Sequence, residues 1–506
     1  MALSRPTPTL IEYPPPMFWL LAACTHPGPE ALRPPVPEAG PSIVRSNDPV
    51  VVIGAGVSGM AAAVEARAHG ARVVVLEREV DRVGGAAEAS KLMMFSGSEE
   101  QAAAGIIDSP EQLLIEWPDF TGGDVTDLWV QQFATQNVPM VRDWLWELGV
   151  TWESPGFDPS AGTTARIHSV SDAGVPLVDS LRDQLPDEVI RMGIEATDLV
   201  QDEHGRITGV QFRDVQTEET GVVAASAVVV ATGGFGWNLE RVRELRPDLQ
   251  DVVLTHASWS GADGNGIDML EAVGAVTQNI EAVGLYAHAS RCPYDVETEM
   301  RVAFQFSVPW VSDVGERFVD ESGRNDFHTA EAIVDEGGVS FMVFDEGTGA
   351  GIFTCDAYGD AIDYTFVELV ESGLVLDGAD LAELAGDLGV DPSILQTELD
   401  SYNAAVRGEQ PDDWRATMED ATPIDTAPYF AMPVAVSVAK MFGGIDVDLR
   451  GRVLDHSGRV IPGLYAAGEL TGMAGGSLVG DAGFTGSLSA VILGGRVAGA
   501  DAAGVQ

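Results

Sequence analysis

Basic residues are scarce in this chain. Of its 506 residues, 28 are Lys or Arg and 78 are Asp or Glu, which gives a formal net charge of −50, and only two of the basic residues are lysines, Lys91 and Lys440. Nucleic-acid binding depends on clusters of Lys and Arg that neutralise phosphates, and such clusters are missing here. The sequence therefore excludes a nucleic-acid partner. The acidic surface indicates solubility through self-repulsion, with adaptation to salt as a second interpretation.

Cysteine and long apolar runs are also scarce. The three cysteines, Cys24, Cys292 and Cys355, form neither a disulfide framework nor a C-x-x-C metal site, so we expect no metal centre. Beyond the N-terminal segment, no apolar run reaches the roughly 18 residues that a transmembrane helix needs. The length of 506 residues is sufficient for two or more domains with large cores.

The N-terminal segment around Cys24 supports two interpretations. Residues 1–24 end in "LLAAC" and resemble a bacterial lipoprotein signal, and residues 25–48 form a Pro-rich linker that cannot build a core. In the first interpretation, Cys24 carries a lipid anchor and the protein lies on the periplasmic side of the cell envelope. In the second, the same residues are a disordered extension of a cytoplasmic protein.

A nucleotide-binding pattern begins at Pro49. The apolar run "VVVI" predicts a buried parallel strand, and Gly54, Gly56 and Gly59 then form G-x-G-x-x-G before a helix and a second strand that ends at Glu77. The first glycine permits a tight turn, the second lets a pyrophosphate approach the backbone, and the third lets the helix pack on the strand. A carboxylate at Glu77 can accept hydrogen bonds from ribose hydroxyls. The pattern predicts an α/β fold with a dinucleotide at a helix N-terminus.

Five further segments carry a family resemblance. They are "GGAAEAS" (84–90), "AVVVATGGFG" (227–236), "GADGNGIDMLEAVGA" (261–275), "GERFVDE" (315–321) and "IPGLYAAGELTG" (461–472). With the glycine motif, they make the chain resemble the fumarate reductase/succinate dehydrogenase flavoprotein and 3-ketosteroid dehydrogenase superfamily (FAD-binding type 2). The resemblance implies FAD, which we expect to be non-covalent because no histidine follows "GGAAEAS".

The resemblance also implies a domain plan. We expect a Rossmann-like FAD-binding domain of the glutathione-reductase type over 49–282 and 441–506, with an inserted α+β capping or substrate domain over 283–440. In relatives the "AAGE" segment and the next helix approach the flavin, so Glu469 is expected at a ribityl or ribose hydroxyl. The residues expected to bind FAD are Gly54, Gly56, Gly59, Glu77, Arg78, Gly84, Gly85, Ala231, Thr232, Gly233, Asp263, Gly468, Glu469, Ser487 and Leu488.

A reaction type follows from the same resemblance. It implies an oxidoreductase that reduces or forms a C=C bond next to a carbonyl or carboxylate by flavin hydride transfer, with a small-molecule substrate and an unidentified electron donor or acceptor. Arg324 stands where fumarate reductases carry their proton donor. Because the pKa of an arginine lies above ~12, a carboxylate such as Glu321 is expected to relay the proton. Lys440 and His288 stand near positions that contact substrate in relatives.

Two departures from the family pattern leave three functions open. The segment "MAGGSLVGDAGF" (473–484) lacks the arginine with which fumarate reductases bind a carboxylate, and Lys440 replaces their histidine. The tyrosines of ketosteroid dehydrogenases are also absent from this segment and from position 324. The alternatives are a fumarate-reductase-like enzyme, a ketosteroid-type or other apolar enone dehydrogenase, and a non-catalytic flavoprotein that serves as a binding or electron-transfer partner.

Overall fold

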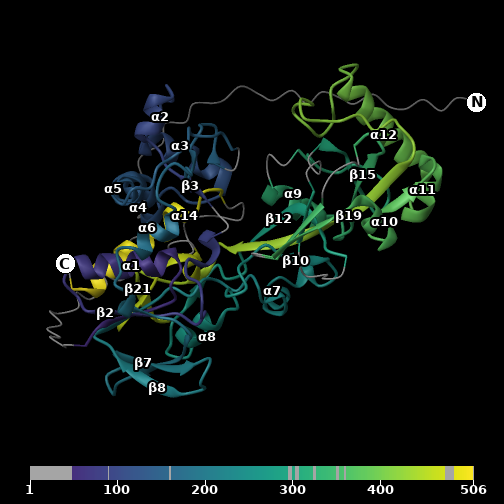
Figure 1. Cartoon of the computed structure of the whole chain (residues 1–506). Helices are drawn as coiled ribbons and strands as arrows, with labels where there is room; N and C mark the ends of the chain where they lie inside the picture. The colour runs from purple at the N-terminus through teal and green to yellow at the C-terminus, as the bar shows by residue number, and fades with distance from the viewer. Residues whose placement is uncertain are drawn as a thin grey trace, which may run out of the picture. The chain divides into compact units, whose positions relative to one another are not determined.

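A parallel sheet surrounds the first apolar strand of the computed structural model (Figure 1). β1 (Val50–Ile53) is buried along its whole length and pairs in parallel with β2 (Val73–Leu76) and β9 (Ala227–Val230). Continuous Val-rich runs suit strands that are covered on both faces. The six-stranded sheet has the order β21 (Arg452–Leu454), β22 (Val460–Ala466), β9, β1, β2, β5 (Ile190–Arg191). The protein is therefore a mixed α/β fold with a parallel sheet, as predicted.

The structure describes residues 48–88, 91–158, 161–293, 299–302, 307–322, 326–348, 353–357, 360–472 and 484–504. Val44–Gln506 forms one compact unit. The predicted signal (1–24), nearly all of the predicted linker (25–48) and Cys24 lie outside the described residues. Within the described residues, no helix combines the length and apolarity that a bilayer span requires.

Two helices pack together on the parallel sheet. α1 (Val57–Ala68) follows β1, and α14 (Leu488–Ala502) lies along it although more than 400 residues separate them (Figure 1). Glycines permit this approach: a Cβ at Gly495 would lie 2.2 Å from the carbonyl oxygen of Ser58, and one at Gly499 would lie 2.2 Å from that of Ala62. The beginning and the end of the described chain therefore share one core.

A second sheet of nine strands is built around the long strand β19 (Tyr429–Met441). Its main path is β14 (Trp310–Ser312), β15 (Ser340–Asp345), β19, β12 (Val283–Arg291), β13 (Glu299–Val302), β16 (Phe353–Ala357) and β17 (Asp360–Tyr364). β10 (Leu254–His256) and β18 (Leu376–Gly378) also pair with β19. β10 precedes the predicted capping segment, so the second sheet extends across that predicted boundary.

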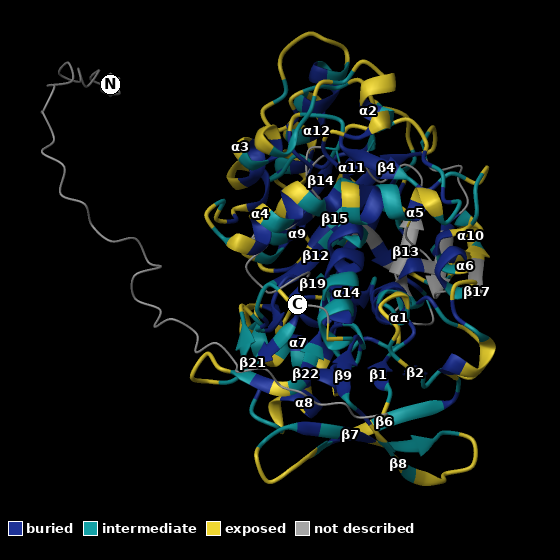
Figure 2. Ribbon diagram, turned by 90° about the vertical axis from the view of Figure 1, so that its left-hand side faces the viewer, coloured by how far each residue is buried: buried dark blue, intermediate teal, exposed yellow. Residues whose placement is uncertain are grey.

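The remaining elements cover these two sheets. The meander β6 (Ile194–Gln201), β7 (Ile207–Asp214), β8 (Thr220–Ala224) exposes much of its surface, whereas β1 and β9 are dark blue in Figure 2. β3 (Leu92–Met94) pairs with β4 (Ile167–Ser169), and β11 (Thr277–Gln278) with β20 (Gly444–Ile445). The other α-helices are α2 (Glu99–Ala103), α3 (Pro110–Thr121), α4 (Leu128–Gln136), α5 (Asp143–Glu147), α6 (Leu177–Arg182), α7 (Leu239–Leu245), α8 (Asn265–Glu271), α9 (Asp326–Asp335), α10 (Phe366–Glu371), α11 (Leu381–Leu388) and α12 (Pro392–Val406).

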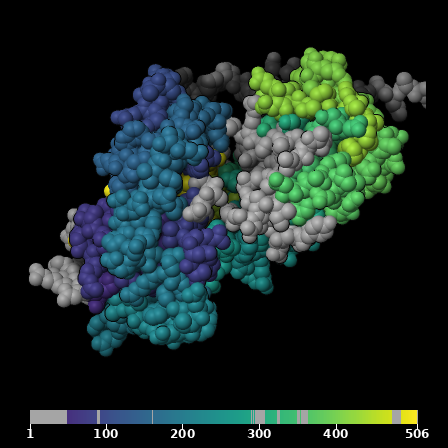
Figure 3. All heavy atoms as spheres, viewed as in Figure 1, coloured from purple at the N-terminus to yellow at the C-terminus, as the bar shows by residue number. Residues whose placement is uncertain are grey.

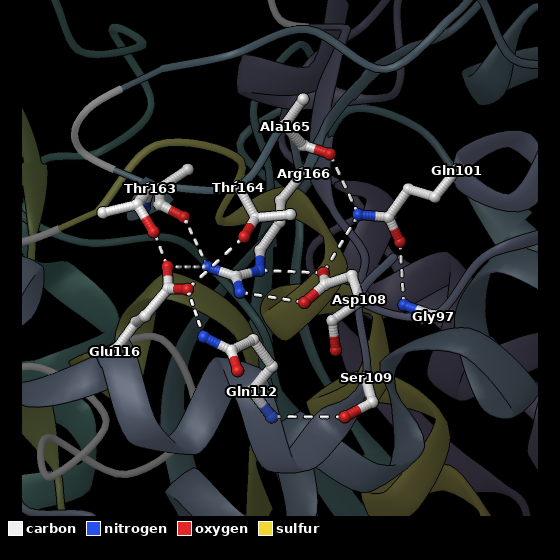
Figure 4. Close-up of polar contacts among 12 residues, drawn as sticks. Gly97, Gln101, Asp108, Ser109, Gln112, Glu116, Thr163, Thr164, Ala165 and Arg166 are labelled. Atoms are coloured by element: carbon white, nitrogen blue, oxygen red, sulfur yellow. Dashed lines mark hydrogen bonds and ion pairs between the residues drawn. The ribbon is translucent and has the colours of Figure 1, made fainter. Parts of the chain in front are cut away.

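A buried ion network fixes α3 among the helices between β3 and β4. On one face of the molecule, the blue spheres of this region lie beside the purple spheres of the β1–α1 region (Figure 3). The helix α6, which follows β4, contacts α1. Arg166 is fully buried and lies between two carboxylates (Figure 4): Asp108 accepts two hydrogen bonds of 2.9 Å, and Glu116 accepts one of 2.8 Å. Gln101 also donates to Asp108 at 3.0 Å. Because each charge has a partner, burial of the network is tolerated.

Cys292 forms a disulfide bond that the low cysteine count did not predict. This residue is buried and disulfide-bonded. Its partner must be Cys24 or Cys355, the other cysteines of the sequence, whose side chains lie outside the described residues. The low count excluded a framework of several disulfides but did not reveal this single bond. Among the described residues, no group of three or more His, Cys, Asp or Glu side chains could hold a metal ion.

Candidate active site

The glycine motif forms the turn between β1 and α1. Gly54 has a positive φ of 98°, and a Cβ there would lie 2.5 Å from the carbonyl oxygen of Ala231, so no other residue fits easily. A Cβ at Gly59 would lie 2.0 Å from the carbonyl oxygen of Gly54, which explains how the helix packs against the turn. α1 has no side-chain hydrogen bond at its N-cap Gly56. Its first N–H groups can therefore bind an anion.

Glu77 follows β2 and lies beside this turn. Its Oε2 accepts a hydrogen bond from the Ala55 N–H at 2.7 Å, and its Oε1 accepts one from the Glu79 N–H at 2.9 Å. Burial raises the pKa of the carboxyl group, although these two N–H groups oppose the shift. The two hydrogen bonds fix the orientation of the carboxylate, and each oxygen retains a lone pair for a ligand hydroxyl.

A cavity of about 360 Å³ runs from the glycine turn to the end of β19. This volume lies within the range of small-molecule and cofactor sites. All the predicted FAD-binding residues line it except Gly59, which packs behind the turn. That they bind FAD remains a prediction. The lining residues are Ile53, Gly54, Gly56–Ser58, Leu76–Glu79, Gly84, Gly85, Ala87, Ile194–Ala196, Ala231–Gly233, Ala257, Trp259, Gly261–Asp263, Asn265, Gly266, Met269, Tyr286, Ala439, Lys440, Ala467–Glu469, Ser487, Leu488 and Val491.

An ion pair crosses the end of the cavity that adjoins Glu77. Arg78 Nη1 donates to Asp263 Oδ2 at 2.5 Å and joins the segment after β2 to the loop before α8. A second contact joins the same two segments: the guanidinium of Arg82, after β2, lies 4.6 Å from the ring centre of Trp259, which precedes α8 and also lines the cavity. One ion pair and one cation–π pair therefore join the segment after β2 to the loop before α8, beside the cavity.

Two observations test whether the cavity fits a dinucleotide such as FAD. A Cβ built on Gly56 meets no atom closer than 4.0 Å. The backbone of Gly56 therefore borders open space, where a pyrophosphate can approach it. Among the described residues, Ser58 Oγ and Thr232 Oγ1 are buried without a hydrogen-bond partner, and both residues line the cavity. Buried hydroxyls normally have partners, and polar ligand atoms would supply them. The cavity therefore fits the cofactor.

Glu469 lines the cavity from the turn η8 (Gly468–Leu470), which follows β22. Its Oε1 accepts a hydrogen bond from the Met441 N–H at 3.0 Å, and its carboxyl group also accepts one from the Gly234 N–H. Burial raises the pKa of this group. The carboxylate therefore ties the end of β19 to the parallel sheet, in addition to its predicted contact with a ribityl or ribose hydroxyl.

Lys440 is the predicted catalytic residue that lines the cavity. Its Nζ donates to the carbonyl oxygen of Phe484 at 3.2 Å. The same Nζ lies 5.6 Å from the ring centre of Tyr286, 5.3 Å from that of Phe327 and 5.9 Å from that of Phe442. Rings within about 6 Å attract a cation through their negative faces. The ammonium group thus lies in a largely aromatic environment at the end of β19.

Two other predicted catalytic residues cannot be placed in this site. Arg324 lies outside the described residues, as does the side chain of His288, whose backbone belongs to β12. β12 also carries Tyr286, which lines the cavity, and α9 begins two residues after position 324. Their roles stay predictions.

Glu321 is buried in an ion network and does not line the cavity. Arg317 Nη2 lies 3.0 Å from Glu321 Oε1, Arg317 Nη1 lies 2.7 Å from Asp412 Oδ1, and Arg415 lies 3.8 Å from Glu321. Burial raises the pKa of Glu321 to about 7. Arg317 is buried and pairs with both carboxylates, which gives it a structural role in this network. Glu321 belongs to the same structural ion network. A proton relay through Glu321 remains a prediction.

Sequence reasoning missed Ser58, Trp259 and Tyr286 at the cavity. Ser58 stands between the second and third glycines of the motif, so its position in the pattern could have identified it. Trp259 stands two residues before Gly261, where the segment "GADGNG" begins. Tyr286 had no sequence signal, because only the pairing of β12 with β19 brings it to Lys440.

Comparisons with known proteins show the family to which the chain belongs. The model of the FAD binding domain family matches residues 49–480. A cytochrome-type fumarate reductase of Shewanella frigidimarina is 28% identical over 461 residues, covering 90% of this chain and 76% of the relative. A urocanate reductase of Eggerthella lenta is 28% identical over 489 residues, covering 92% and 76%.

A solved structure extends the likeness to the steroid enzymes. The 3-ketosteroid Δ1-dehydrogenase of Sterolibacterium denitrificans has a TM-score of 0.75 and 17% identity, with 91% of this chain and all of that chain covered. At this identity the likeness shows a shared fold only. The family resemblance predicted from the motifs is confirmed, and so is FAD as the cofactor. The chain belongs to the FAD binding domain family, and it is an FAD-dependent oxidoreductase similar to fumarate reductases.

Proposed function

We propose that this protein reduces a C=C bond conjugated with a carboxylate or carbonyl group, using electrons that FAD receives from a separate donor. The observation that carries the proposal is the continuous cavity between the glycine turn at Gly54 and the Lys440 ammonium group. The cavity fits a dinucleotide beside the glycine turn, and Lys440 lines it at the end of β19. The relatives named for fumarate and urocanate reduction support this direction of reaction.

The domain plan is part of the proposal. Residues 49–282 and 441–506 form a glutathione-reductase-type FAD domain, and 283–440 form a capping domain. The pairing of β1, β2, β9 and β22 in one parallel sheet supports the first assignment. The second sheet around β19 supports the second, although β10 joins it from the preceding segment.

The chain's residues would hold FAD along the cavity. The N–H groups at the start of α1 would bind the pyrophosphate, and Glu77 would accept a hydrogen bond from a ribose hydroxyl. The hydroxyl groups of Ser58 and Thr232 would form hydrogen bonds with polar atoms of the cofactor. When bound, FAD supplies the transfer of a hydride to one carbon of the double bond. Lys440 binds the carboxylate or carbonyl oxygen of the substrate and withdraws electron density from the double bond.

A proton must reach the second carbon of the double bond. The proposed donor is Arg324, and the alternative donors are His288 and Glu321. Arg324 requires a carboxylate relay, because a free guanidinium has a pKa above ~12. The pKa of about 7 for Glu321 suits proton exchange near neutral pH, which supports a relay, whereas its ion pair with Arg317 favours a structural role.

A location at the cell envelope belongs to the proposal as well. The lipobox-like "LLAAC" sequence supports a lipid anchor at Cys24, and the disulfide at Cys292 supports folding in an oxidising compartment. The physiological donor would then be an electron carrier of that compartment. Labelling of the wild-type protein with a radioactive lipid precursor, and no labelling of Cys24→Ala, is expected. Equal labelling of both forms would contradict the anchor.

An activity assay with a reduced dye tests the proposed function. The holoenzyme, given reduced methyl viologen, is expected to consume dye only when an enoate or enone is present. Arg324→Ala is expected to reduce kcat by about 10²–10⁴-fold, the usual contribution of a proton donor, without loss of FAD. Arg459→Ala removes an exposed surface arginine and serves as the matched control. Full activity of Arg324→Ala would contradict Arg324 as the proton donor. If no enoate or enone causes consumption of the dye, the proposed function is wrong.

A further inference from the structure

Trp259 places an indole ring beside the cofactor cavity, in the loop before α8. A Cβ built on Gly261 would lie 2.8 Å from Trp259 Cδ1 and 3.3 Å from Arg78 Nη2, so the ring and the guanidinium are neighbours across a glycine. Arg78 follows Glu77 directly in the chain. The indole ring therefore lies beside the part of the cavity that Glu77 and Arg78 line.

Apolar residues line the cavity beside Glu77. The N–H of Ile194 donates to the carbonyl oxygen of Glu77 at 2.8 Å, and Ile194 also lines the cavity. Met269 lines it from α8, which contacts β6, the strand that begins at Ile194. Apolar and aromatic surfaces bind the faces of a planar base, whereas a phosphate needs N–H groups or cations. This part of the cavity therefore suits a base.

Two contacts hold the loop of Trp259 against the segment that follows β2. The guanidinium of Arg82 lies over the indole ring, 4.6 Å from its centre, and Arg78 pairs with Asp263 at 2.5 Å. A cation over a ring is attracted to the negative face of that ring. Because both contacts join the same two segments, they set the position of the ring relative to Glu77.

The direction of a dinucleotide in the cavity follows from the glycine turn. Its pyrophosphate belongs at the N-terminus of α1, and its adenosine ribose belongs at the acid that ends the second strand, which is Glu77. The adenine base is bonded directly to that ribose. The base therefore reaches the surface formed by Ile194, Met269 and Trp259, while the flavin half extends from the pyrophosphate toward Lys440.

We propose that the indole ring of Trp259 stacks on the adenine base of FAD, and that Arg82 is a positioning residue that holds this ring in place. We expect FAD to be non-covalent, so the stacking contact contributes to its retention. The contact also selects FAD over FMN, because FMN lacks the adenosine half. Neither residue has a role in the proposed reaction, so the inference concerns the cofactor alone.

Titrations of the apoprotein with FAD and with FMN test the stacking contact, and the change in flavin fluorescence reports binding. Trp259→Ala is expected to lower the affinity for FAD by about 10–100-fold, the usual contribution of an aromatic ring that stacks on a base, whereas Trp259→Phe stays within about threefold of the wild type. The affinity for FMN should change less than about threefold, since FMN carries no adenine.

Trp414→Ala is the matched control, because Trp414 is 44% exposed and does not line the cavity. Wild-type FAD affinity in Trp259→Ala overturns the proposal, and so does an equal loss of affinity for FAD and FMN.

A double-mutant cycle tests the role of Arg82. Arg82→Met alone is expected to lower the affinity for FAD by about 3–10-fold. In the Trp259→Ala background it should change the affinity less than about twofold, because Arg82 acts through the ring. Losses that multiply in the double variant would give Arg82 a separate role and overturn its assignment as a positioning residue.

Thermal unfolding separates a ligand contact from a structural role. The apoproteins of Trp259→Ala and the wild type are expected to have equal Tm values. A lower Tm, together with weaker FMN binding, would make Trp259 a structural residue and overturn the stacking contact. These measurements require no turnover, so the assay with enoates and enones tests the proposed function independently.

Discussion

The carboxylate of Glu77 accepts two backbone N–H groups and faces the cavity, so its charge and position are set by the turn on which the glycine motif depends. At the scale of single residues, the site consists of such fixed groups. Glu77, Glu469 and Lys440 each make a hydrogen bond to the backbone of another segment. Replacing one of them therefore changes a ligand contact and a structural contact together.

Glu77→Ala is expected to weaken FAD binding by about 10–100-fold, because it removes a charged acceptor and leaves the Ala55 and Glu79 N–H groups without their partner. FAD retained after gel filtration, and fluorescence titration of the apoprotein with FAD, measure the effect. Glu203→Ala, at an exposed loop, is the control. FAD affinity equal to that of the wild type would show that Glu77 does not contact the cofactor.

Glu116 provides a prediction with a defined pH range. Burial would raise its pKa, but hydrogen bonds from Arg166, Gln112 and the Thr163 N–H outweigh burial and lower the pKa to about 2. The ionised group therefore stabilises the fold above its ordinary pKa of 4.5, and the contribution is lost as the pH falls toward 2. Glu116→Gln is expected to lower Tm at pH 7 by several degrees.

The difference in Tm between Glu116→Gln and the wild type is expected to shrink when the pH is lowered from 5 to 3, and scanning calorimetry at four pH values measures it. Gln112→Leu, which removes a neutral partner of Glu116, is the comparison, and its effect at pH 7 should be smaller. A difference that stays constant from pH 7 to pH 3 would contradict the assigned charge.

At the scale of elements, α3 connects the buried ion network to the end of the cavity that Lys440 lines. Glu116 on α3 pairs with Arg166, and the next residue, Trp117, lies 5.4 Å from Phe484 between ring centres. The carbonyl oxygen of Phe484 accepts the hydrogen bond from Lys440. The helix therefore packs against the residue whose carbonyl oxygen orients the Lys440 ammonium group.

The contact between α1 and α14 gives a prediction about packing. Gly499→Val introduces side-chain atoms where a Cβ alone would lie 2.2 Å from the carbonyl oxygen of Ala62, so the helices must separate. We expect destabilisation of at least about 1–3 kcal/mol and weaker FAD binding, because α14 begins at the cavity with Leu488. Chemical unfolding and FAD titration measure both effects.

The control for this packing prediction is Gly386→Ala in α11. A Cβ at Gly386 meets no atom within 4 Å, and its backbone is helical, so alanine should stabilise the protein by about 0.5–1 kcal/mol through lower chain entropy. Destabilisation by both substitutions, or by neither, would contradict the distinction between a close helix contact and open space.

At the scale of the whole molecule, the features that could be predicted from the sequence are those formed by residues close together along the chain. The βαβ unit with Gly54, Gly56 and Glu77 was recognisable because its residues lie within about 30 positions of one another. The resemblance then supplied Asp263 and Glu469, which line the same cavity.

The parts that could not be predicted depend on pairing between distant segments. The partners of Arg166 lie 58 and 50 residues away, and Lys440 reaches Tyr286 only through the pairing of β12 with β19. Nothing in local periodicity marks such contacts. The disulfide at Cys292 was missed for a similar reason, since three cysteines formed no recognisable spacing.

The central claim concerns the whole enzyme, and one anaerobic single-turnover measurement tests it most directly. Holoenzyme is reduced with one equivalent of dithionite, mixed separately with one equivalent of fumarate, acrylate, cinnamate or benzalacetone, and followed by flavin absorbance and by NMR of the product. We expect complete reoxidation by at least one of these acceptors, with one saturated product molecule formed per flavin. Because both added hydrogens come from solvent, one through the exchangeable N–H of reduced flavin and one as a proton, D₂O should place one deuterium on each carbon of the former double bond. A flavin that stays reduced with cinnamate, fumarate, acrylate and benzalacetone alike would contradict the account.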